Sequence, residues 1–343
     1  MIKKAASILS AVCLLAILLY LATLLLIPKY MEKTKEGSLI SEYYSEIEKG
    51  LSHQVIFVGD CEVYESFVPP LLWEKYGISS YVRGSPQQLI WQSYYLLEEM
   101  LEYERPEAVV FNVLSMKYGE PQREEYNRLT LDGMRWSKNK LLAIKASMTD
   151  KESVTSYIFP LLRYHSRWKE LTQEDFKYMF KREPISHNGY LMNLSIKAVK
   201  DDIEASPLID SSLPDICFDY LDKMRELCAK KGIRLILVKA PTNSWRYWWY
   251  DEWDRQICAY AERFGIDYYN FIGNEEIAID WSKDTYDGGV HLNVYGAEKM
   301  TKYFGRLLSE KYNIESRWES AELSSAWREK LENFYEERND KVE

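Results

Sequence analysis

Three short and almost continuously apolar segments constrain the fold of this chain more than any other feature of its sequence. Residues 55–58, 108–113 and 234–238 each contain four apolar residues in succession. A strand with one face in water would alternate apolar and polar side chains, so these segments predict strands that are covered on both faces. Such strands are typical of a parallel sheet buried between helices.

Helical segments separate these strands or follow them. In residues 87–104, Leu89, Leu97 and Leu101 recur at helical spacing, and Gly232 stands where a helix would stop before the third strand. We predict helices at residues 87–104, 214–231, 253–264 and 296–311, and further short strands at 80–84 and 266–271. Strands that alternate with helices predict an α/β fold, here a three-layer sandwich with a central parallel sheet.

The N-terminal region contains 23 consecutive residues without a charge, from Ala5 to Ile27. At about 1.5 Å per helical residue, this length spans a hydrocarbon core of about 30 Å. We therefore predict that residues 1–28 form a single-pass membrane anchor. A cleaved signal peptide is the alternative, although the apolar stretch is long for one and no Ala-x-Ala-like site follows it. Lys3 and Lys4 favour a cytoplasmic N-terminus and an extracytoplasmic domain, while three lysines soon after the span weaken this signal.

The remaining chain divides into three predicted parts. Residues 29–50 are charged and contain tyrosine, and we interpret them as a juxtamembrane helix or stalk. Residues 51–312 carry the α/β pattern, which is lost between about 115 and 206. That stretch is rich in Tyr, Trp, Arg and Met, and we interpret it as a mostly helical insertion. Residues 313–343 are predicted to form a polar helical tail.

Charge and cysteine content exclude two classes of function. The net charge is −9 and no basic stripe is present to neutralise phosphates, which argues against a nucleic-acid partner. The five cysteines include no CxxC pair and no Cys/His cluster, so we expect no metal site and no cofactor. Cys217 and Cys228 lie in a helical pattern and are interpreted as small buried residues.

The residues that directly follow the predicted strands are candidates for a functional site. In open parallel sheets, ligands bind beyond the carboxyl ends of the strands. These positions hold, in chain order, Gly59-Asp60-Cys61, Gly84, Asn112 and a loop that contains Asp284, Asp287 and His291.

Together these residues resemble the sequence blocks of the SGNH/GDSL hydrolase superfamily. Gly59-Asp60-Cys61 is similar to the first block, Gly-Asp-Ser, while Gly84 and Asn112 are similar to the second and third. Asp287 and His291 resemble the last block, Asp-x-x-His. The N-terminal membrane segment and the long insertion resemble the bacterial cell-surface branch, which includes the lipoteichoic-acid D-alanylation protein and the alginate-acetylation proteins. The resemblance covers roughly residues 52–312.

The chain departs from the family pattern at two positions. Cys61 stands where the family has its nucleophilic serine, and Asp287 lies four residues before His291 instead of three. Gly288 and Gly289 provide the conformational freedom to absorb the additional residue. Asp284 is the alternative partner for the histidine.

The resemblance implies acyl transfer. Cys61 would attack an ester carbonyl, His291 would act as base and then as acid, and Asp287 would orient the imidazole. The backbone N–H groups of Cys61 and Gly84 and the side chain of Asn112 would hold the oxyanion. An ordinary thiol has a pKa near about 8.5, which a neighbouring imidazolium lowers. The residues alone leave open that Cys61 is a buried structural thiol in a site that only binds.

The implied function is that of a membrane-anchored extracytoplasmic O-acyltransferase or esterase acting on a cell-envelope polysaccharide or a teichoic-acid-like polymer. By the same resemblance, a multi-pass membrane acyltransferase is an expected partner. One alternative is a catalytically degenerate protein that binds a glycan or a partner in its cleft. Another is a thioesterase for soluble substrates, because fold does not decide function.

Two aromatic and basic segments are candidates for substrate binding. Arg163, His165 and Arg167 in the insertion could face phosphate or carboxylate groups of an acceptor. Trp245 and Arg246 follow a predicted strand and could border the cleft. Packing between domains or within the core is the alternative for both segments.

Overall fold

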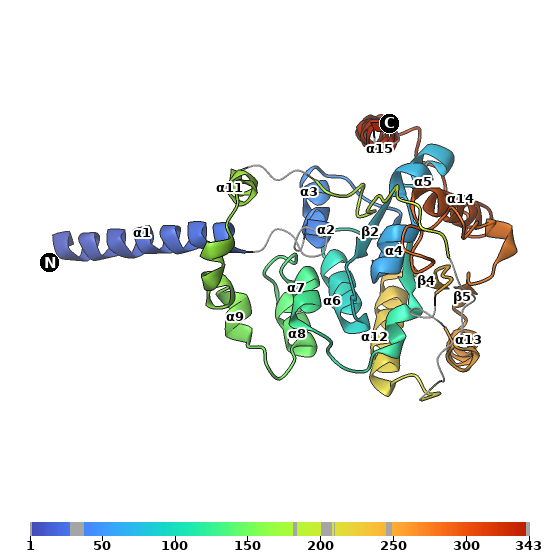
Figure 1. Ribbon diagram of the computed structural model, residues 1–343, viewed down its shortest axis with the longest axis horizontal. Coiled ribbons are helices and arrows are strands. Elements are labelled where there is room, and N and C mark those ends of the chain that lie inside the picture. Colours follow the sequence, from blue (N-terminus) through green and yellow to red (C-terminus); the bar gives the residue numbers. More distant parts are fainter. Residues whose placement is uncertain are drawn as a thin grey trace.

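The computed structural model describes residues 2–27, 38–180, 184–199, 208, 210–244 and 249–340. Within these residues, five parallel strands form one sheet in the order β2-β1-β3-β4-β5 (Figure 1). The strands are β1 (Val55–Gly59), β2 (Ser80–Gly84), β3 (Ala108–Asn112), β4 (Arg234–Lys239) and β5 (Asp267–Asn270). The prediction of an α/β fold with a central parallel sheet is confirmed.

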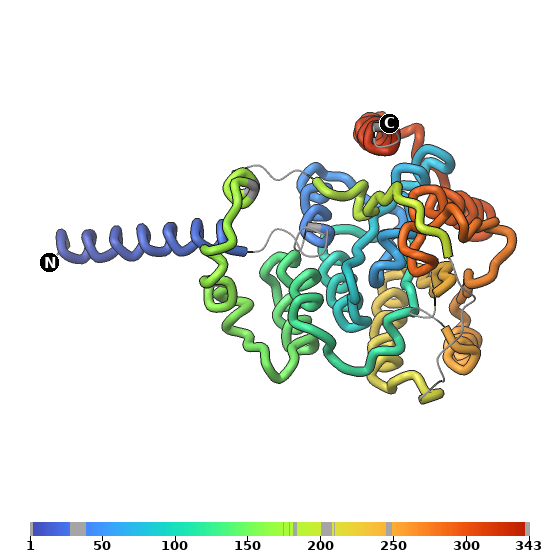
Figure 2. Tube along the Cα trace, viewed as in Figure 1, coloured from blue at the N-terminus to red at the C-terminus, as the bar shows by residue number. Residues whose placement is uncertain are grey.

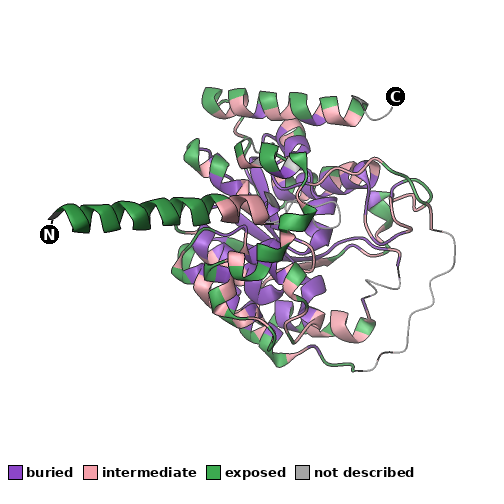
Figure 3. Ribbon diagram, turned by 60° about the vertical axis from the view of Figure 1, so that its left-hand side comes forward, coloured by how far each residue is buried: buried purple, intermediate pink, exposed green. Residues whose placement is uncertain are grey.

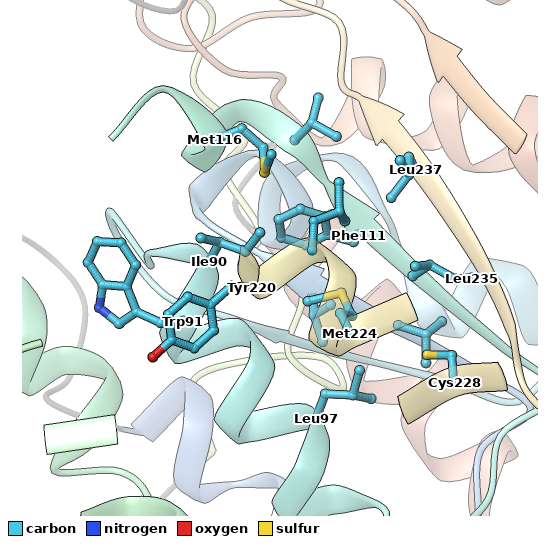
Figure 4. Close-up of a cluster of buried hydrophobic side chains, with 14 of the residues drawn as sticks. Ile90, Trp91, Leu97, Phe111, Met116, Tyr220, Met224, Cys228, Leu235 and Leu237 are labelled. Atoms are coloured by element: carbon cyan, nitrogen blue, oxygen red, sulfur yellow. The ribbon is translucent and has the colours of Figure 1, made fainter. Parts of the chain in front are cut away.

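Helices cover both faces of the sheet. One face carries α6 (Ile90–Met100), α12 (Asp215–Lys231) and α13 (Asp251–Phe264), and the other carries α4 (Cys61–Ser66), α5 (Pro69–Tyr76) and α14 (Val294–Glu310). Ile56 and Val58 of β1 pack towards the first group, whereas Val55 and Phe57 pack towards the second. Figure 4 shows the first of these two clusters, in which Trp91, Phe111 and Met224 fill the space between strands and helices. Burial of both faces is the reason why the strand sequences do not alternate.

Two helix starts differ from the sequence prediction, one because of a backbone conformation and the other because of a capping side chain. Helix α6 begins at Ile90, after Gln87 adopts a positive φ of 52° and breaks the helical path. Helix α14 begins at Val294, because the Asn293 side chain accepts hydrogen bonds from the backbone N–H groups of Tyr295 and Gly296. An asparagine at this position caps the free N–H groups of the first turn.

Part of the segment predicted to be a stalk belongs to the folded body. Residues 28–37 lie outside the described residues, and α2 (Ser38–Ser41) and α3 (Tyr43–Glu48) follow them. Ile40, Tyr43 and Tyr44 are buried. The segment is thus helical, and a stalk separate from the body is wrong for α2 and α3, because their apolar side chains complete the core.

The insertion begins with the 3-10 helix η1 and continues with short helices. Their bounds are η1 (Val113–Lys117), α7 (Glu124–Leu131), α8 (Lys138–Ser147), α9 (Val154–Ile158), α10 (Leu161–Tyr164), η2 (His165–Glu170) and α11 (Gln173–Phe180). Residues 184–199 then return along the body without helix, as the yellow-green tube of Figure 2 shows. The backbone N–H of Val82 donates to Asn188, and the N–H of Leu191 donates to Tyr64. Backbone hydrogen bonds thus fix this returning segment to β2 and α4.

Helix α1 (Ile2–Leu26) projects from the body. Its residues Lys3–Leu26 are long and apolar enough to cross a membrane, as a signal sequence also would be. Figure 3 shows the helix exposed along most of its length and partly buried at the end that meets the body.

Towards the C-terminal end of the chain, η4 (Glu275–Ile277) precedes α14. Helix α15 (Ala321–Asp340) packs against α5, and its residues Trp327 and Phe334 are buried. Helix α15 is thus docked on the body.

A buried ion pair joins β2 to α6. The Arg83 guanidinium lies 3.3 Å from the Glu99 carboxylate, and neither side chain is exposed. Tyr44 donates a hydrogen bond to the same carboxylate, and the guanidinium lies over the ring of Tyr43. The four side chains form a closed arrangement that ties α3 to the sheet.

We expect Glu99→Leu to lower the free energy of unfolding by about 3–5 kcal/mol, because the Arg83 charge would stay buried without its partner. The double variant Arg83→Met/Glu99→Leu should recover most of this loss. The measurement is denaturant unfolding of the full chain in detergent, followed by tryptophan fluorescence. The pair of Arg225 and Glu226 supplies the control: Glu226 is exposed, so Glu226→Leu should change stability by less than about 1 kcal/mol. Equal effects of the two single variants would contradict the prediction.

Candidate active site

The ends of β1, β2 and β3 bring three predicted site residues together. Gly59 and Gly84 are opposite each other in the register of β1 and β2, and Asn112 ends the adjacent strand β3. A Cβ atom on Gly84 would lie 2.6 Å from Val63 Cγ2 and 3.1 Å from the carbonyl oxygen of Asp60. Only glycine therefore allows the turn that carries Cys61 to pack directly on the end of β2.

Cys61 is the first residue of α4, at the turn from strand β1 to this helix. Asp60 caps the helix by accepting a hydrogen bond from the Glu62 backbone N–H at 3.1 Å. The Cys61 side chain is buried, and burial raises the pKa of its thiol although His291 acts in the opposite direction. The turn thus presents the thiol at the carboxyl edge of the sheet in its protonated form.

His291 is held by Asp287 through two hydrogen bonds. Its Nδ1 lies 2.6 Å from Asp287 Oδ2, and its backbone N–H donates to Oδ1 of the same carboxylate at 2.9 Å. Gly288 and Gly289 adopt φ values of 83° and 95° between them. These conformations accommodate the additional residue between Asp287 and His291, and the four-residue spacing still permits the contact.

Cys61 and His291 interact through their side chains. Cys61 is among the groups that raise the pKa of His291, and His291 in turn acts to lower the pKa of the thiol. Because Asp287 occupies Nδ1, Nε2 is the ring nitrogen that remains for the thiol proton. The structure therefore brings Cys61, His291 and Asp287 together in the order that nucleophilic catalysis requires.

A second carboxylate, Glu65, lies beside the histidine. Its Oε2 is 3.4 Å from His291 Nδ1, and its Oε1 accepts a hydrogen bond of 2.7 Å from the Tyr286 hydroxyl. The Tyr286 ring is stacked on the imidazole. Burial raises the pKa of Glu65 to about 7, although His291 and Tyr286 act to lower it. The sequence analysis missed this residue, whose position four residues after Cys61 places both on one face of α4.

The carboxylates determine the charge of His291. Burial alone would lower its pKa, but Glu65, Cys61 and Asp287 raise it well above the ordinary value. The pKa of Asp287 is lowered, because its contact with His291 outweighs burial. The raised pKa of His291 stabilises the fold fully below about pH 6.5, and this contribution is lost as the pH rises through the folded-state value.

A buried ion pair lies behind the Cys61 turn. Lys239 Nζ, at the end of β4, is 2.6 Å from Glu62 Oε1. The Asn112 amide donates to Glu62 Oε2 at 2.7 Å and to Asp60 Oδ1 at 3.4 Å. Burial and the charge of Glu62 raise the pKa of Asp60 to about 7. The Asn112 amide is thus directed at two carboxyl groups in this structure, and its role as an oxyanion donor stays a prediction.

The remaining predicted site residues lie elsewhere. Asp284 contacts Lys299 at 2.6 Å, and Asp287 is the aspartate on His291. Arg163 pairs with Glu124, and Arg167 donates to the backbone carbonyl groups of Leu26 and Ile27. With His165 they lie in α10 and η2, next to α1, so the structure does not bring this group to Cys61. Trp245 and Arg246 lie outside the described residues.

Within the described residues, no group of three or more His, Cys, Asp or Glu side chains is arranged to hold a metal ion.

Comparison with known proteins gives matches among solved structures. No family model matches the chain, and no curated protein matches it. A proposed acylhydrolase from Bacteroides fragilis is 13% identical, with a TM-score of 0.40, over 81% of this chain and 99% of its own. A GDSL-like lipase from Bacteroides thetaiotaomicron is 15% identical, with a TM-score of 0.39, over 80% of this chain and 100% of its own.

We expect Asp287→Asn to lower the pKa of His291, because the substitution removes the negatively charged carboxylate that lies beside Nδ1. Proton–carbon NMR spectra of the histidine side chains, recorded against pH for the full chain in detergent, measure the shift. Asp284→Asn is the matched control: it removes a nearby carboxylate that pairs with Lys299 and should leave the His291 titration in place. An unchanged titration in Asp287→Asn would contradict the geometry.

Proposed function

We propose that this protein is a membrane-anchored acyl-transfer enzyme in which Cys61 is the nucleophile. The proposal rests on one observation above all: a thiol at a strand-to-helix turn interacts with a histidine whose Nδ1 is held by an aspartate at 2.6 Å. Nucleophile, base and orienting carboxylate are the components of nucleophilic catalysis at carbonyl groups. The three residues come from α4 and the loop before α14, on the edge where parallel sheets place ligands.

In the proposed first step, the Cys61 sulfur attacks the carbonyl carbon of an ester, and the thiol proton passes to Nε2 of His291. Collapse of the tetrahedral intermediate breaks the carbon–oxygen bond, and the leaving alcohol takes the proton from His291. In the second step, a hydroxyl group of an acceptor or a water molecule attacks the thioester, again with His291 as base. The acyl group then leaves as an ester or an acid, and the thiol is restored.

The backbone N–H groups of Cys61 and Gly84 are proposed to stabilise the oxyanion. Both groups lie at the carboxyl ends of adjacent strands, where the close packing of Gly84 on the turn brings them together. Fixed backbone donors of this kind stabilise the tetrahedral intermediate without reorganisation. Tyr118 and Lys117 lie near enough to Cys61 and Asp60 for their charges to interact, so they border the same site.

The proposed acceptor is a hydroxyl-bearing polymer of the cell envelope. Two features support it: α1 would hold the domain at a membrane surface, and a thioester intermediate suits relay of an acyl group at least as well as hydrolysis. Orientation with the domain outside the cytoplasm, and supply of the acyl group by a multi-pass membrane acyltransferase, complete the proposal.

A second candidate function is binding without catalysis. The observation that favours it is the closed state of the site, because Cys61 is buried with a raised thiol pKa and the Asn112 amide is directed at Glu62 and Asp60. A site that has lost its catalytic activity would keep the same fold. The two functions differ in whether the thiol accepts an acyl group.

We expect incubation of the full chain with p-nitrophenyl butyrate to give a single butyryl adduct, detected by intact mass spectrometry. Cys61→Ala should give no adduct. His291→Ala should be acylated at least about 100-fold more slowly than the wild type, because the thiol loses its base. Cys258→Ala is the matched control at a partly buried cysteine and should behave as the wild type. Absence of adduct and of turnover with acetyl, butyryl and longer acyl esters would favour the binding function.

The acylation rate should rise with pH through the pKa of His291, because only the neutral imidazole accepts the thiol proton. Glu65→Gln removes a negative charge that raises this pKa, and it should therefore shift the rising limb to lower pH. The measurement is the rate of adduct formation as a function of pH. Glu104→Gln, at a buried glutamate beside His53, is the control and should leave the profile in place. A profile that moves to higher pH in Glu65→Gln would contradict the assignment of His291 as base.

A further inference from the structure

The end of α1 is joined to the insertion by specific contacts. Its last residues pack against α10, η2 and α11. The Arg167 guanidinium donates to the carbonyl oxygens of Leu26 and Ile27, both at 3.1 Å, and Asp175 holds the same guanidinium at 2.9 Å. The carbonyl groups of a last helical turn have no partner within the helix, so Arg167 satisfies groups that would otherwise need water. These contacts fix the insertion relative to α1.

The length of α1 determines the level at which these contacts lie. Residues Lys3–Leu26 comprise 24 positions, or about 36 Å of helix, against about 30 Å of hydrocarbon. If Lys3 lies at one membrane surface, residues 22–27 lie at the other. Residues 22–27 are also those that change from exposed to partly buried, where the insertion contacts α1 (Figure 3). The helices that contact them are therefore placed at the level of the lipid headgroups.

The same helices expose large apolar side chains. In the described part of the chain beyond α1, eleven large apolar side chains are exposed, and six of them lie within residues 158–180. These six are between 44% and 86% exposed, and they are Ile158, Phe159, Leu162, Trp168, Phe176 and Phe180. The other five are spread over the rest of the fold. Such a concentration on a soluble surface would be costly, and it marks an interaction site.

We propose that residues 154–180, from α9 to α11, dock on the lipid bilayer next to the point where α1 emerges. The partner is the interface between headgroups and acyl chains, which accommodates tryptophan and phenylalanine rings together with basic side chains such as Arg163, Lys169 and Lys177. The proposal rests on anchorage by α1, which is part of the proposed function, and it does not depend on acyl chemistry. Docking gives the domain two attachments and a fixed orientation above the membrane.

Photo-crosslinking in liposomes tests the docking. Full-length protein with photoreactive benzoylphenylalanine in place of Trp168 or Phe180 is reconstituted into vesicles of phosphatidylethanolamine and phosphatidylglycerol and irradiated. Lipid adducts are then measured by mass spectrometry. The control places the same residue at Trp318, which is also exposed but lies against α5 through a hydrogen bond to the Trp73 carbonyl. We expect at least a tenfold excess of lipid adducts at the first two positions over the control.

A double variant and an extraction separate docking from anchorage. Phe176→Ser/Phe180→Ser should reduce lipid adducts at position 168 several-fold, while the chain still resists extraction by alkaline carbonate through α1. If alkaline carbonate extracts the wild-type chain from the vesicles, the chain is not anchored by α1, and the premise of the proposal is wrong. With anchorage intact, crosslinks to a second protein chain, or lipid adducts equal to those at Trp318, would overturn the docking. Neither readout uses Cys61, so either failure is distinguishable from failure of the acylation assay.

Discussion

The position of the candidate nucleophile depends on a buried ion pair. Lys239 and Glu62 are both removed from water, and a charge in this environment is tolerated only with a partner. Glu62 follows Cys61 directly in α4, whereas Lys239 ends β4, and Asn112 at the end of β3 donates to the same carboxylate. If α4 moved relative to the sheet, two buried charges would separate. The requirement to keep them together therefore fixes the turn that carries the thiol.

Groups in the same region raise the pKa of the Cys61 thiol. Asp60 and Glu65 both act to raise the pKa of Cys61, and burial acts in the same direction. His291 opposes them, but its own positive charge is shared with Asp287 and Glu65. A preformed thiolate–imidazolium pair would place one more negative charge among three carboxyl groups. In the proposed mechanism, the thiol proton passes to those molecules in which His291 has lost its own proton, because only a neutral imidazole acts as general base.

Features that depend on local sequence were predicted, and those that depend on distant contacts were not. The strands at 55–58 and 234–238 were recognised because a strand covered on both faces is apolar throughout. Ligands bind beyond the carboxyl ends of parallel strands, and this rule led to the prediction that Cys61 and His291 lie on one edge of the sheet. Lys239 and Glu62 were missed because neither has meaning until β4 and α4 are adjacent. The contact between Arg167 and the end of α1 likewise joins residues about 140 positions apart, which no periodicity reveals. Glu65 is the exception, since its four-residue spacing from Cys61 was visible in the sequence.

The segment 184–199 links the sheet to the loop that carries His291. It comes after α11 in the insertion, and it passes β2 and α4. It then runs beside the loop of His291, where the Lys197 N–H donates to Thr285 and the Gly288 N–H donates to Lys197. At Gly189 a Cβ atom would lie 1.9 Å from the carbonyl oxygen of Val82, so the segment approaches the sheet as closely as backbone allows. Contacts made by backbone groups on both sides leave little freedom for sliding. The sheet therefore also positions the loop of the candidate active site, because one segment is hydrogen-bonded to β2 and α4 and to that loop.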